Sequence, residues 1–413
     1  MCPDRHLKTS DEVDIHLRSL ITWHATPEKL LAQLCRSVHG AYPTDVLAQA
    51  AVLRERGEIQ ANAAVFSHTP SPQTIALEVA QSKLPLPHPN DFEWRFSHRG
   101  CEVITDIVRS LVRTEGSHVA LLGTSGYAEY VSGADIPIRA RLFELRPEAC
   151  SVIESLRSVA VTIGDVGQTW HHYPTAFDCV VADPPWYPKV IETFIRAAAG
   201  LLKDGGTLLL CAPGLTTRPG LPAERRNLLA TAASEGLILD QLLPRAVEYE
   251  SPPFELSALQ AGGLAGFDPY WRVGDLFTFR RLPGARGAKS FEPGEQLSID
   301  DGWAEVTLGR ARIRVNTNRT QPATTDQPLE GVVPGNVLDS VSSRDHRRSI
   351  PNVWTTTNRV YATNEPDRLL MALSRLAQGD AIDTGGITKD SYTDAAERIV
   401  SEELAALRHF GIH

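Results

Sequence analysis

Residues 177–187, Phe-Asp-Cys-Val-Val-Ala-Asp-Pro-Pro-Trp-Tyr, join an apolar run to an acid, two prolines and two aromatic residues. The run is typical of a buried strand, and a strand that ends in an acid brings its carboxylate to the carboxyl edge of the sheet, where ligands bind in open α/β folds. The two prolines fix the backbone and remove two N–H donors, so that only carbonyl acceptors remain. We therefore expect Asp183, Pro184, Pro185 and Trp186 to form a catalytic corner that holds an amine by its N–H groups.

Three further strand-like runs precede this corner, and each leads to a residue that suits a ligand. The runs lie at 119–123, 140–145 and 159–165. The first ends at Gly123, where the lack of a side chain allows a tight turn against a ligand. The second carries Glu144, which lies 21 residues after Gly123, and the third ends at Asp165. An acid at this spacing can accept hydrogen bonds from a ribose diol, so the pattern indicates a nucleoside cofactor.

The pattern around these runs predicts an α/β fold. Helical spacing appears at 101–113, 147–157, 188–202 and 224–235. Further strand-like runs follow at 207–211, 238–243 and 274–281. Strands that alternate with helices favour a mostly parallel sheet, and the long connection before the final run favours an antiparallel last strand.

The loop after the first strand separates two kinds of cofactor. Gly123-Thr124-Ser125-Gly126 does not match the G-x-G-x-x-G pattern that cradles a pyrophosphate, so a dinucleotide is not supported. Asp165 and Asp183 suit an adenine amine and a nucleophilic amine rather than a nicotinamide.

Gly123, Glu144, Asp165 and the tetrapeptide 183–186, in this order, resemble the class I S-adenosylmethionine (SAM)-dependent methyltransferases. The Asp-Pro-Pro-Trp tetrapeptide looks like the catalytic motif of amino methyltransferases. The resemblance covers about 100–282 and implies a Rossmann-like fold, SAM as the cofactor, and transfer of a methyl group to an amine nitrogen.

The same resemblance implies a role for each residue around the corner. The loop Gly123, Thr124, Ser125 and Gly126 would contact the cofactor. Glu144 with Leu145 would bind the ribose, and Asp165 with Val166 would bind the adenine. Trp186 and Tyr187 would stack on the substrate.

A second family is similar in layout. The branched-chain polyamine synthases pair an N-terminal winged helix with this fold and an Asp-Pro-Pro motif, and they transfer aminopropyl groups from decarboxylated SAM. The segment 97–100 and the loop 124–126 depart from the signatures of that family. A third reading is a nucleic-acid-binding regulator with a methyltransferase-like fold, which rests on the N-terminal helices and on the basic stretch 280–289.

Length and composition predict several domains and a cytoplasmic protein. The 413 residues carry 42% hydrophobic and 22% charged residues and a formal net charge of −9, which creates no global field that would attract nucleic acid. The six cysteines contain no CxxC pair, so we expect no metal site. No apolar run is long enough to cross a membrane, and the N-terminus lacks the apolar core of a signal peptide.

We expect three regions. Residues 1–95 read as a winged-helix-like helical region with a proline-rich linker, 96–283 as the catalytic domain, and 284–413 as a small α+β domain. In the first region, helices are expected to start at Pro27 and Pro43. In the last, strands are expected at 296–299 and 303–315, joined by a turn at 300–302, a strand-like stretch at 353–361, and helices at 364–377 and 390–408.

The substrate is not determined by these patterns. A base in a nucleic acid, a nitrogen in a protein side chain and a small-molecule amine would all fit the corner at Asp183, and the acidic net charge favours the last two. The C-terminal region could recognise the substrate or join two copies as a homodimer.

Overall fold

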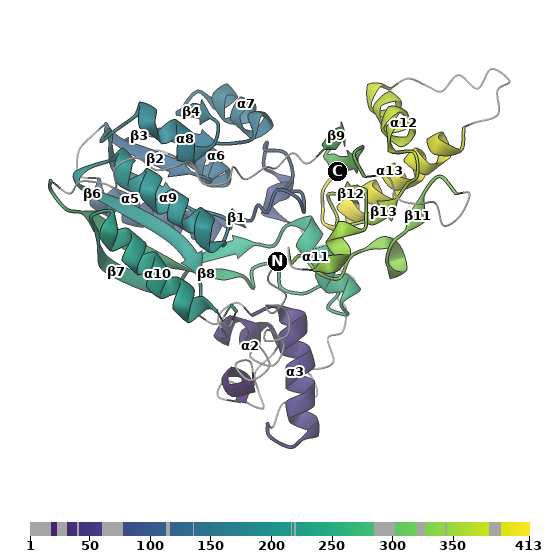
Figure 1. Cartoon of the computed structure of the whole chain (residues 1–413), viewed down its shortest axis with the longest axis horizontal. Coiled ribbons are helices and arrows are strands. Elements are labelled where there is room, and N and C mark those ends of the chain that lie inside the picture. The colour runs from purple at the N-terminus through teal and green to yellow at the C-terminus, as the bar shows by residue number, and fades with distance from the viewer. Residues whose placement is uncertain are drawn as a thin grey trace, which may run out of the picture.

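Two sheets, formed by different parts of the chain, dominate the structure (Figure 1). The computed structural model describes residues 18–22, 31–38, 41–59, 77–112, 116–134, 136–215, 217–218, 220–284, 302–319, 327–342, 345–379 and 390–413. Within this part of the chain, no helix combines the length and the apolar character that crossing a membrane requires.

The large sheet has eight strands in the order β1-β7-β8-β6-β5-β2-β3-β4. Their bounds are β1 Arg95–Phe96, β2 Ser117–Leu122, β3 Ile138–Glu144, β4 Val159–Ile163, β5 Phe177–Ala182, β6 Leu202–Pro213, β7 Leu237–Glu250 and β8 Val273–Arg281. Strands β2 to β6 pair in parallel, and β8 runs antiparallel to both β6 and β7. This arrangement confirms the predicted Rossmann-like sheet with an antiparallel last strand.

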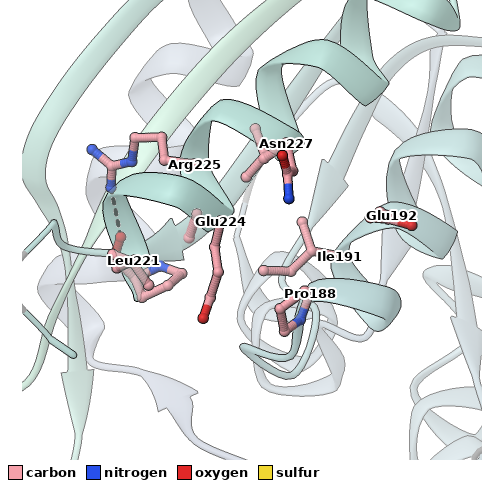
Figure 2. A pocket seen from close by; sticks show the side chains of 10 residues that line it. Pro188, Ile191, Glu192, Leu221, Glu224, Arg225 and Asn227 are labelled. Carbon is pink, nitrogen blue, oxygen red and sulfur yellow. Dashed lines mark hydrogen bonds between the residues drawn. The ribbon is translucent and has the colours of Figure 1, made fainter. Parts of the chain in front are cut away.

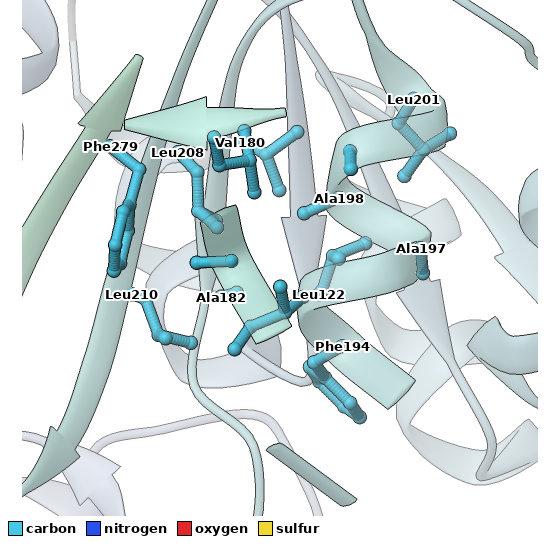
Figure 3. Packing of buried hydrophobic residues seen from close by; sticks show 14 of the residues in the cluster. Leu122, Val180, Ala182, Phe194, Ala197, Ala198, Leu201, Leu208, Leu210 and Phe279 are labelled. Carbon is cyan, nitrogen blue, oxygen red and sulfur yellow. The ribbon is translucent and has the colours of Figure 1, made fainter. Parts of the chain in front are cut away.

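Helices cover both faces of this sheet. They are α5 His98–Leu111, α6 Ser125–Gly133, α7 Pro147–Leu156, α8 Val166–Thr169, α9 Pro188–Leu201 and α10 Leu221–Ser234, with the short turn η2 Trp170–His172. Figure 3 shows Leu122, Val180 and Ala182 of the central strands facing Phe194 and Ala198 of α9, all of them buried. The central strands are apolar and buried over residues 119–122 and 179–182, as expected for strands that helices cover on both faces.

One local expectation was wrong. The residues after Gly123 were read as an open loop, but Ser125 and Gly126 form the first turn of α6. The chain enters this helix directly after Thr124, so the backbone N–H groups of the turn belong to a helix N-terminus rather than to a free loop.

The N-terminal helices pack against the helix that follows β7. Helices α2 Leu31–Ser37 and α3 Pro43–Glu55 share a buried cluster with α11 Pro253–Ala261. Helix α3 begins at Pro43, as predicted, because proline fits the first helical position. The predicted start of the preceding helix at Pro27 lies outside the described residues.

The C-terminal region forms a five-stranded antiparallel sheet in the order β11-β13-β12-β10-β9, covered by two helices. The elements are β9 Trp303–Leu308, β10 Ala311–Asn316, β11 Glu330–Gly331, β12 Val353–Thr355, β13 Val360–Ala362, α12 Pro366–Gln378 and α13 Ser391–His409, with turns η3 Pro334–Asn336 and η4 His346–Ser349. The helices expected at 364–377 and 390–408 correspond to α12 and α13, and the strand-like stretch at 353–361 corresponds to β12 and β13. The run at 303–315, which was expected as one strand, instead forms the antiparallel hairpin of β9 and β10. The strand expected at 296–299 and most of the turn at 300–302 lie outside the described residues.

The segment 77–91, which was read as part of a linker, packs between the two sheets. It includes the turn η1 Glu78–Ala80 and the buried Leu84 and Leu86. From the small sheet, Arg310 donates hydrogen bonds to the carbonyls of Val79 and Ser82 at 3.1 and 2.8 Å. The small sheet is therefore bound to main-chain groups of this segment.

Candidate active site

A cavity of about 790 Å³ opens at the carboxyl edge of the large sheet. Residues from several parts of the chain line it: the start of α3 (Tyr42, Thr44, Asp45), residues 91–94, the ends of the strands β2 to β5, residues 217–218, 249 and 271–272, and residues 339–342, 345 and 347 of the C-terminal region. Regions far apart in the sequence therefore meet at the cavity.

Most of the predicted site residues meet in this cavity. Those that line it are Gly123, Glu144, Leu145, Asp165, Val166, Asp183, Pro184, Pro185, Trp186 and Tyr187. They come together because the parallel strands β2, β3, β4 and β5 all end at this edge.

Three predicted cofactor residues do not line the cavity. Thr124 and Ser125 are buried in the turn into α6, and a side chain at Gly126 would meet the aliphatic part of Arg95. The Ser125 hydroxyl instead donates to Oε1 of Glu93 at 3.0 Å. Of this stretch, only Gly123 faces the cavity.

Tyr249, which the sequence analysis did not predict as a site residue, holds the Asp183 side chain at the end of β5. The hydroxyl of Tyr249, near the end of β7, donates to Oδ1 of Asp183 at 2.8 Å. Burial raises the pKa of the Asp183 carboxyl well above its usual range, and the Tyr249 hydrogen bond acts in the opposite direction. The predicted strand ended at residue 243, whereas β7 continues to Glu250, so no local signal placed Tyr249 at the site.

Glu144 is oriented by its own backbone. Its Oε1 accepts hydrogen bonds from the amides of Leu145 and Arg146 at 3.0 and 3.1 Å and faces Nε of Arg146 at 3.4 Å. Among the described residues, no donor reaches Oε2 of Glu144, which leaves this oxygen to accept from a ligand. Asp165 is likewise preorganised, because its Oδ1 accepts from the amide of Gly167 at 2.8 Å and caps α8.

Aromatic rings form the wall beside Asp183. The Arg272 guanidinium lies 4.9, 5.8 and 4.7 Å from the ring centres of Trp94, Trp186 and Trp271. It pairs with the buried carboxylate of Glu255, which also accepts from Nε1 of Trp94 at 3.1 Å. The Trp186 ring therefore lies near a cation that the protein itself supplies, and it also packs against the Tyr249 ring, with 5.6 Å between the ring centres.

The backbone of the corner is also fixed. Nη2 of Arg218 donates to the carbonyl of Trp186 at 2.7 Å, and the Tyr187 ring meets the edge of Phe92 at 6.0 Å. The nitrogen of Pro185 carries no hydrogen, so the Pro184–Pro185 peptide offers a carbonyl acceptor and no N–H donor. The arrangement can accept two N–H bonds from one nitrogen, through the Asp183 carboxylate and the Pro184 carbonyl.

A second, much smaller cavity lies between α9 and α10 (Figure 2). Its volume is about 20 Å³, and Pro188, Ile191 and Leu221 contribute apolar surface to it. A space of this size holds about one water molecule and no larger ligand. The large cavity is therefore the candidate active site.

Gly123→Ala should destabilise the folded protein more than the same change at Gly379, a glycine with similar backbone geometry. Gly123 has a φ of +65°, and an added Cβ would lie 3.1 Å from the carbonyl oxygen of Asp183. Gly379 has a φ of +72° with nothing within 4 Å of the added atom, so Gly379→Ala measures the backbone strain alone. We expect Gly379→Ala to lower the free energy of unfolding by about 1–2 kcal/mol, and Gly123→Ala to exceed that value, in urea unfolding experiments. Equal losses would contradict a tight contact between Gly123 and the main chain at Asp183.

Comparisons with known proteins give structural matches but no sequence matches. Neither protein-family models nor curated protein sequences yield a match to this chain. Among solved structures, a mutein of the branched-chain polyamine synthase from Thermus thermophilus, in complex with N4-aminopropylspermidine and 5′-methylthioadenosine, is similar over 67% of this chain and 90% of its own, with 13% identity and a TM-score of 0.50. A SAM-dependent methyltransferase from Methanosarcina mazei is similar over 43% of this chain and 97% of its own, with 14% identity and a TM-score of 0.30. The similarity to the polyamine synthase structure supports the Rossmann-like fold. At 13% identity, it supports the fold and no shared activity.

Proposed function

We propose that this chain is a SAM-dependent N-methyltransferase that methylates an amine held by Asp183 and the carbonyl of Pro184. One observation carries the proposal: the buried Asp183 corner shares a single cavity with Gly123, Glu144 and Asp165. A nucleoside cofactor and an amine could therefore lie side by side.

The residues fit the ribose and the adenine of the cofactor. Oε2 of Glu144 can accept from the ribose diol, and Asp165 with the neighbouring Val166 can hold the adenine. When bound, SAM supplies an electrophilic methyl group on a sulfonium.

The chain's own contribution to the transfer is mainly positioning. Asp183 and the Pro184 carbonyl accept the N–H bonds of the amine, which directs the nitrogen lone pair. The Asp183 carboxylate stabilises the positive charge that develops on the nitrogen. Trp186 and its neighbouring rings keep water away from this corner and strengthen the interaction.

The substrate that suits this cavity is a small amine. Residues at the start of α3 and residues 339–342, 345 and 347 of the C-terminal region line the cavity together with the strand ends. Its volume lies toward the upper end of the roughly 300–1,000 Å³ typical of small-molecule sites, enough for a cofactor and a compact substrate together. Acidic side chains outnumber arginines in the lining of the cavity, which would favour a positively charged molecule, although Asp339 is itself paired with Arg347.

Aminopropyl transfer from decarboxylated SAM is the second candidate. It is favoured by the likeness to the polyamine synthase, which extends over 67% of this chain and thus beyond the large sheet and its helices. No comparable observation favours a nucleic-acid-binding regulator. Its basic residues Arg280 and Arg281 pair with Asp240 and Asp204, and 285–290 lie outside the described residues.

Calorimetric titration with SAM and with decarboxylated SAM tests both candidates. We expect SAM to bind the wild-type protein, and Glu144→Ala to weaken binding about 10- to 100-fold, since hydrogen bonds to a charged group contribute roughly 1.5–3 kcal/mol. Glu154→Ala, which changes an exposed acid on α7, should leave binding unchanged. Tighter binding of decarboxylated SAM would favour aminopropyl transfer, and binding of neither compound would reject the proposal.

Tyr249→Phe should change both the rate of transfer and its pH dependence. The phenol stabilises the ionised form of Asp183, which is the form that accepts the amine N–H bonds. Without it, the pKa of Asp183 rises further, so the acid limb of the kcat profile should move to higher pH. We expect kcat at neutral pH to fall about 10-fold, as for loss of one hydrogen bond to a charged group. Steady-state rates across pH check this result, and an unshifted acid limb would show that Tyr249 does not act on Asp183.

A further inference from the structure

A cluster of charged side chains lies where the small sheet meets the nucleoside end of the cavity. We call it the Asp91 cluster; its members are Asp91, Glu93, Arg146, Glu305, Arg312 and Arg314. The Asp91 side chain has no exposed surface, and the side chains of Arg312 and Arg314 are 5% and 10% exposed. The proposed function uses none of these groups directly.

On one side, the cluster is anchored in the small sheet. Arg312 and Arg314, on β10, donate to Oδ2 and Oδ1 of Asp91, each at 2.6 Å. Glu305, on β9, bridges the same two arginines, at 2.8 Å from Arg312 and 2.7 Å from Arg314. The two oxygens of Asp91 are thus each bound by a different arginine of the C-terminal region.

On the other side, the cluster reaches the predicted ribose site. Nη1 of Arg146 donates to Oε2 of Glu93 at 2.8 Å and lies 3.5 Å from Oδ2 of Asp91. Nε of Arg146 lies 3.4 Å from Oε1 of Glu144. Although burial alone would raise it, the guanidinium groups of Arg146 and Arg95 lower the pKa of Glu93 to about 2, so Glu93 is an anion in this arrangement.

We propose that Asp91 is a positioning residue that couples the small sheet to the cofactor site through Arg146 and Glu144; this inference rests on the proposed function. Arg312 and Arg314 balance the charge of Asp91. Arg146 is therefore not drawn closer to Asp91 and binds Glu93 and Glu144 instead. When one of those arginines is lost, the buried carboxylate draws the Arg146 guanidinium toward itself, because an uncompensated buried charge is costly. Glu144 then loses a partner that orients it. By linkage, a cofactor bound at Glu144 strengthens the contact between Asp91 and the small sheet to the same degree.

Other contacts hold the small sheet in place independently of Asp91. Arg310 donates to the carbonyls of Val79, Ser82 and Leu84, and Nη2 of Arg348 donates to the carbonyl of Pro89 at 3.1 Å. Loss of one Asp91 partner should therefore leave the sheet docked. An effect of such a variant on cofactor binding can therefore be distinguished from a loss of docking of the small sheet.

The test compares Arg314→Gln with Arg310→Gln, two changes on one hairpin at one interface. We expect Arg314→Gln to raise the Kd for SAM about 5- to 20-fold in calorimetry, within the usual range of coupling between sites. Arg310→Gln loses its bonds to carbonyl groups and touches neither Asp91 nor Arg146, so its Kd should equal that of the wild type. Arg314→Lys, which keeps the charge, should recover most of the affinity and serves as the second variant if Arg314→Gln does not fold.

A measurement without ligand makes the inference testable by itself. The amides of Leu145 and Arg146 donate to Glu144, so they should exchange hydrogen faster in Arg314→Gln than in Arg310→Gln or the wild type. The coupling would be overturned if Arg314→Gln changed neither the amide hydrogen exchange at residues 145–146 nor the Kd for SAM. It would also be overturned if Arg310→Gln changed both quantities as much as Arg314→Gln does. If the wild type bound no SAM, the proposed function would fail, while exchange at residues 145–146 would still report whether the small sheet acts on Glu144.

Discussion

Asp183→Asn should lower kcat for transfer from SAM to small amines by about 10²- to 10³-fold, with the Kd for SAM unchanged. Asparagine keeps the shape of the side chain and can still accept from Tyr249, but it carries no charge to stabilise the developing ammonium. Losses of this size accompany removal of one group that stabilises charge in a transition state. Formation of S-adenosylhomocysteine with a panel of primary and secondary amines measures the rate.

Asp178→Asn is the matched control, because Asp178 lies at the opposite end of the same strand. Its carboxylate accepts from Nζ of Lys203 at 2.7 Å and from the amide of His118 at 2.9 Å, away from the cavity. We expect its kcat to equal that of the wild type. Near-normal turnover in Asp183→Asn would show that another group holds the amine.

Glu255→Ala should destabilise the protein by about 3–5 kcal/mol. Glu255 has no exposed surface, and its loss leaves the Arg272 guanidinium, which is only 12% exposed, without a counter-charge among three tryptophan rings. Removing one partner of a buried ion pair typically costs this much. The free energy of unfolding in urea measures the effect.

An exposed ion pair on the same domain provides the comparison. Asp240 and Arg280 lie 3.3 Å apart with side chains 53% and 48% exposed, so Asp240→Asn should cost less than about 1 kcal/mol. If Glu255→Ala also lowered the free energy of unfolding by less than about 1 kcal/mol, the aromatic rings alone would hold Arg272. Trp186 should also become mobile in Glu255→Ala, and its fluorescence should then be quenched more readily by acrylamide.

Much of the fold and part of the site could be predicted because they depend on local patterns. Buried parallel strands are continuous apolar runs, so β2 to β6 were visible in the sequence. The residues at the ends of those strands, Gly123, Glu144, Asp165 and Asp183, were then placed together by one rule, since parallel strands end at a common edge. Ser125 and Gly126 were misplaced because a loop and a first helical turn look alike in so short a stretch.

The sequence by itself therefore determined that the sheet is mostly parallel with an antiparallel last strand, and which chemical groups lie at its carboxyl edge. Only the tertiary structure decided what surrounds them. Tyr249 bonds to Asp183 across 66 positions, and Arg314 bonds to Asp91 across 223. Such contacts arise from the folding of distant elements against each other, and no periodicity or short motif encodes them. The corner at Asp183 could be predicted because one strand and its turn carry it, whereas its counter-charges, its walls and its link to the small sheet come from the packing of separate regions.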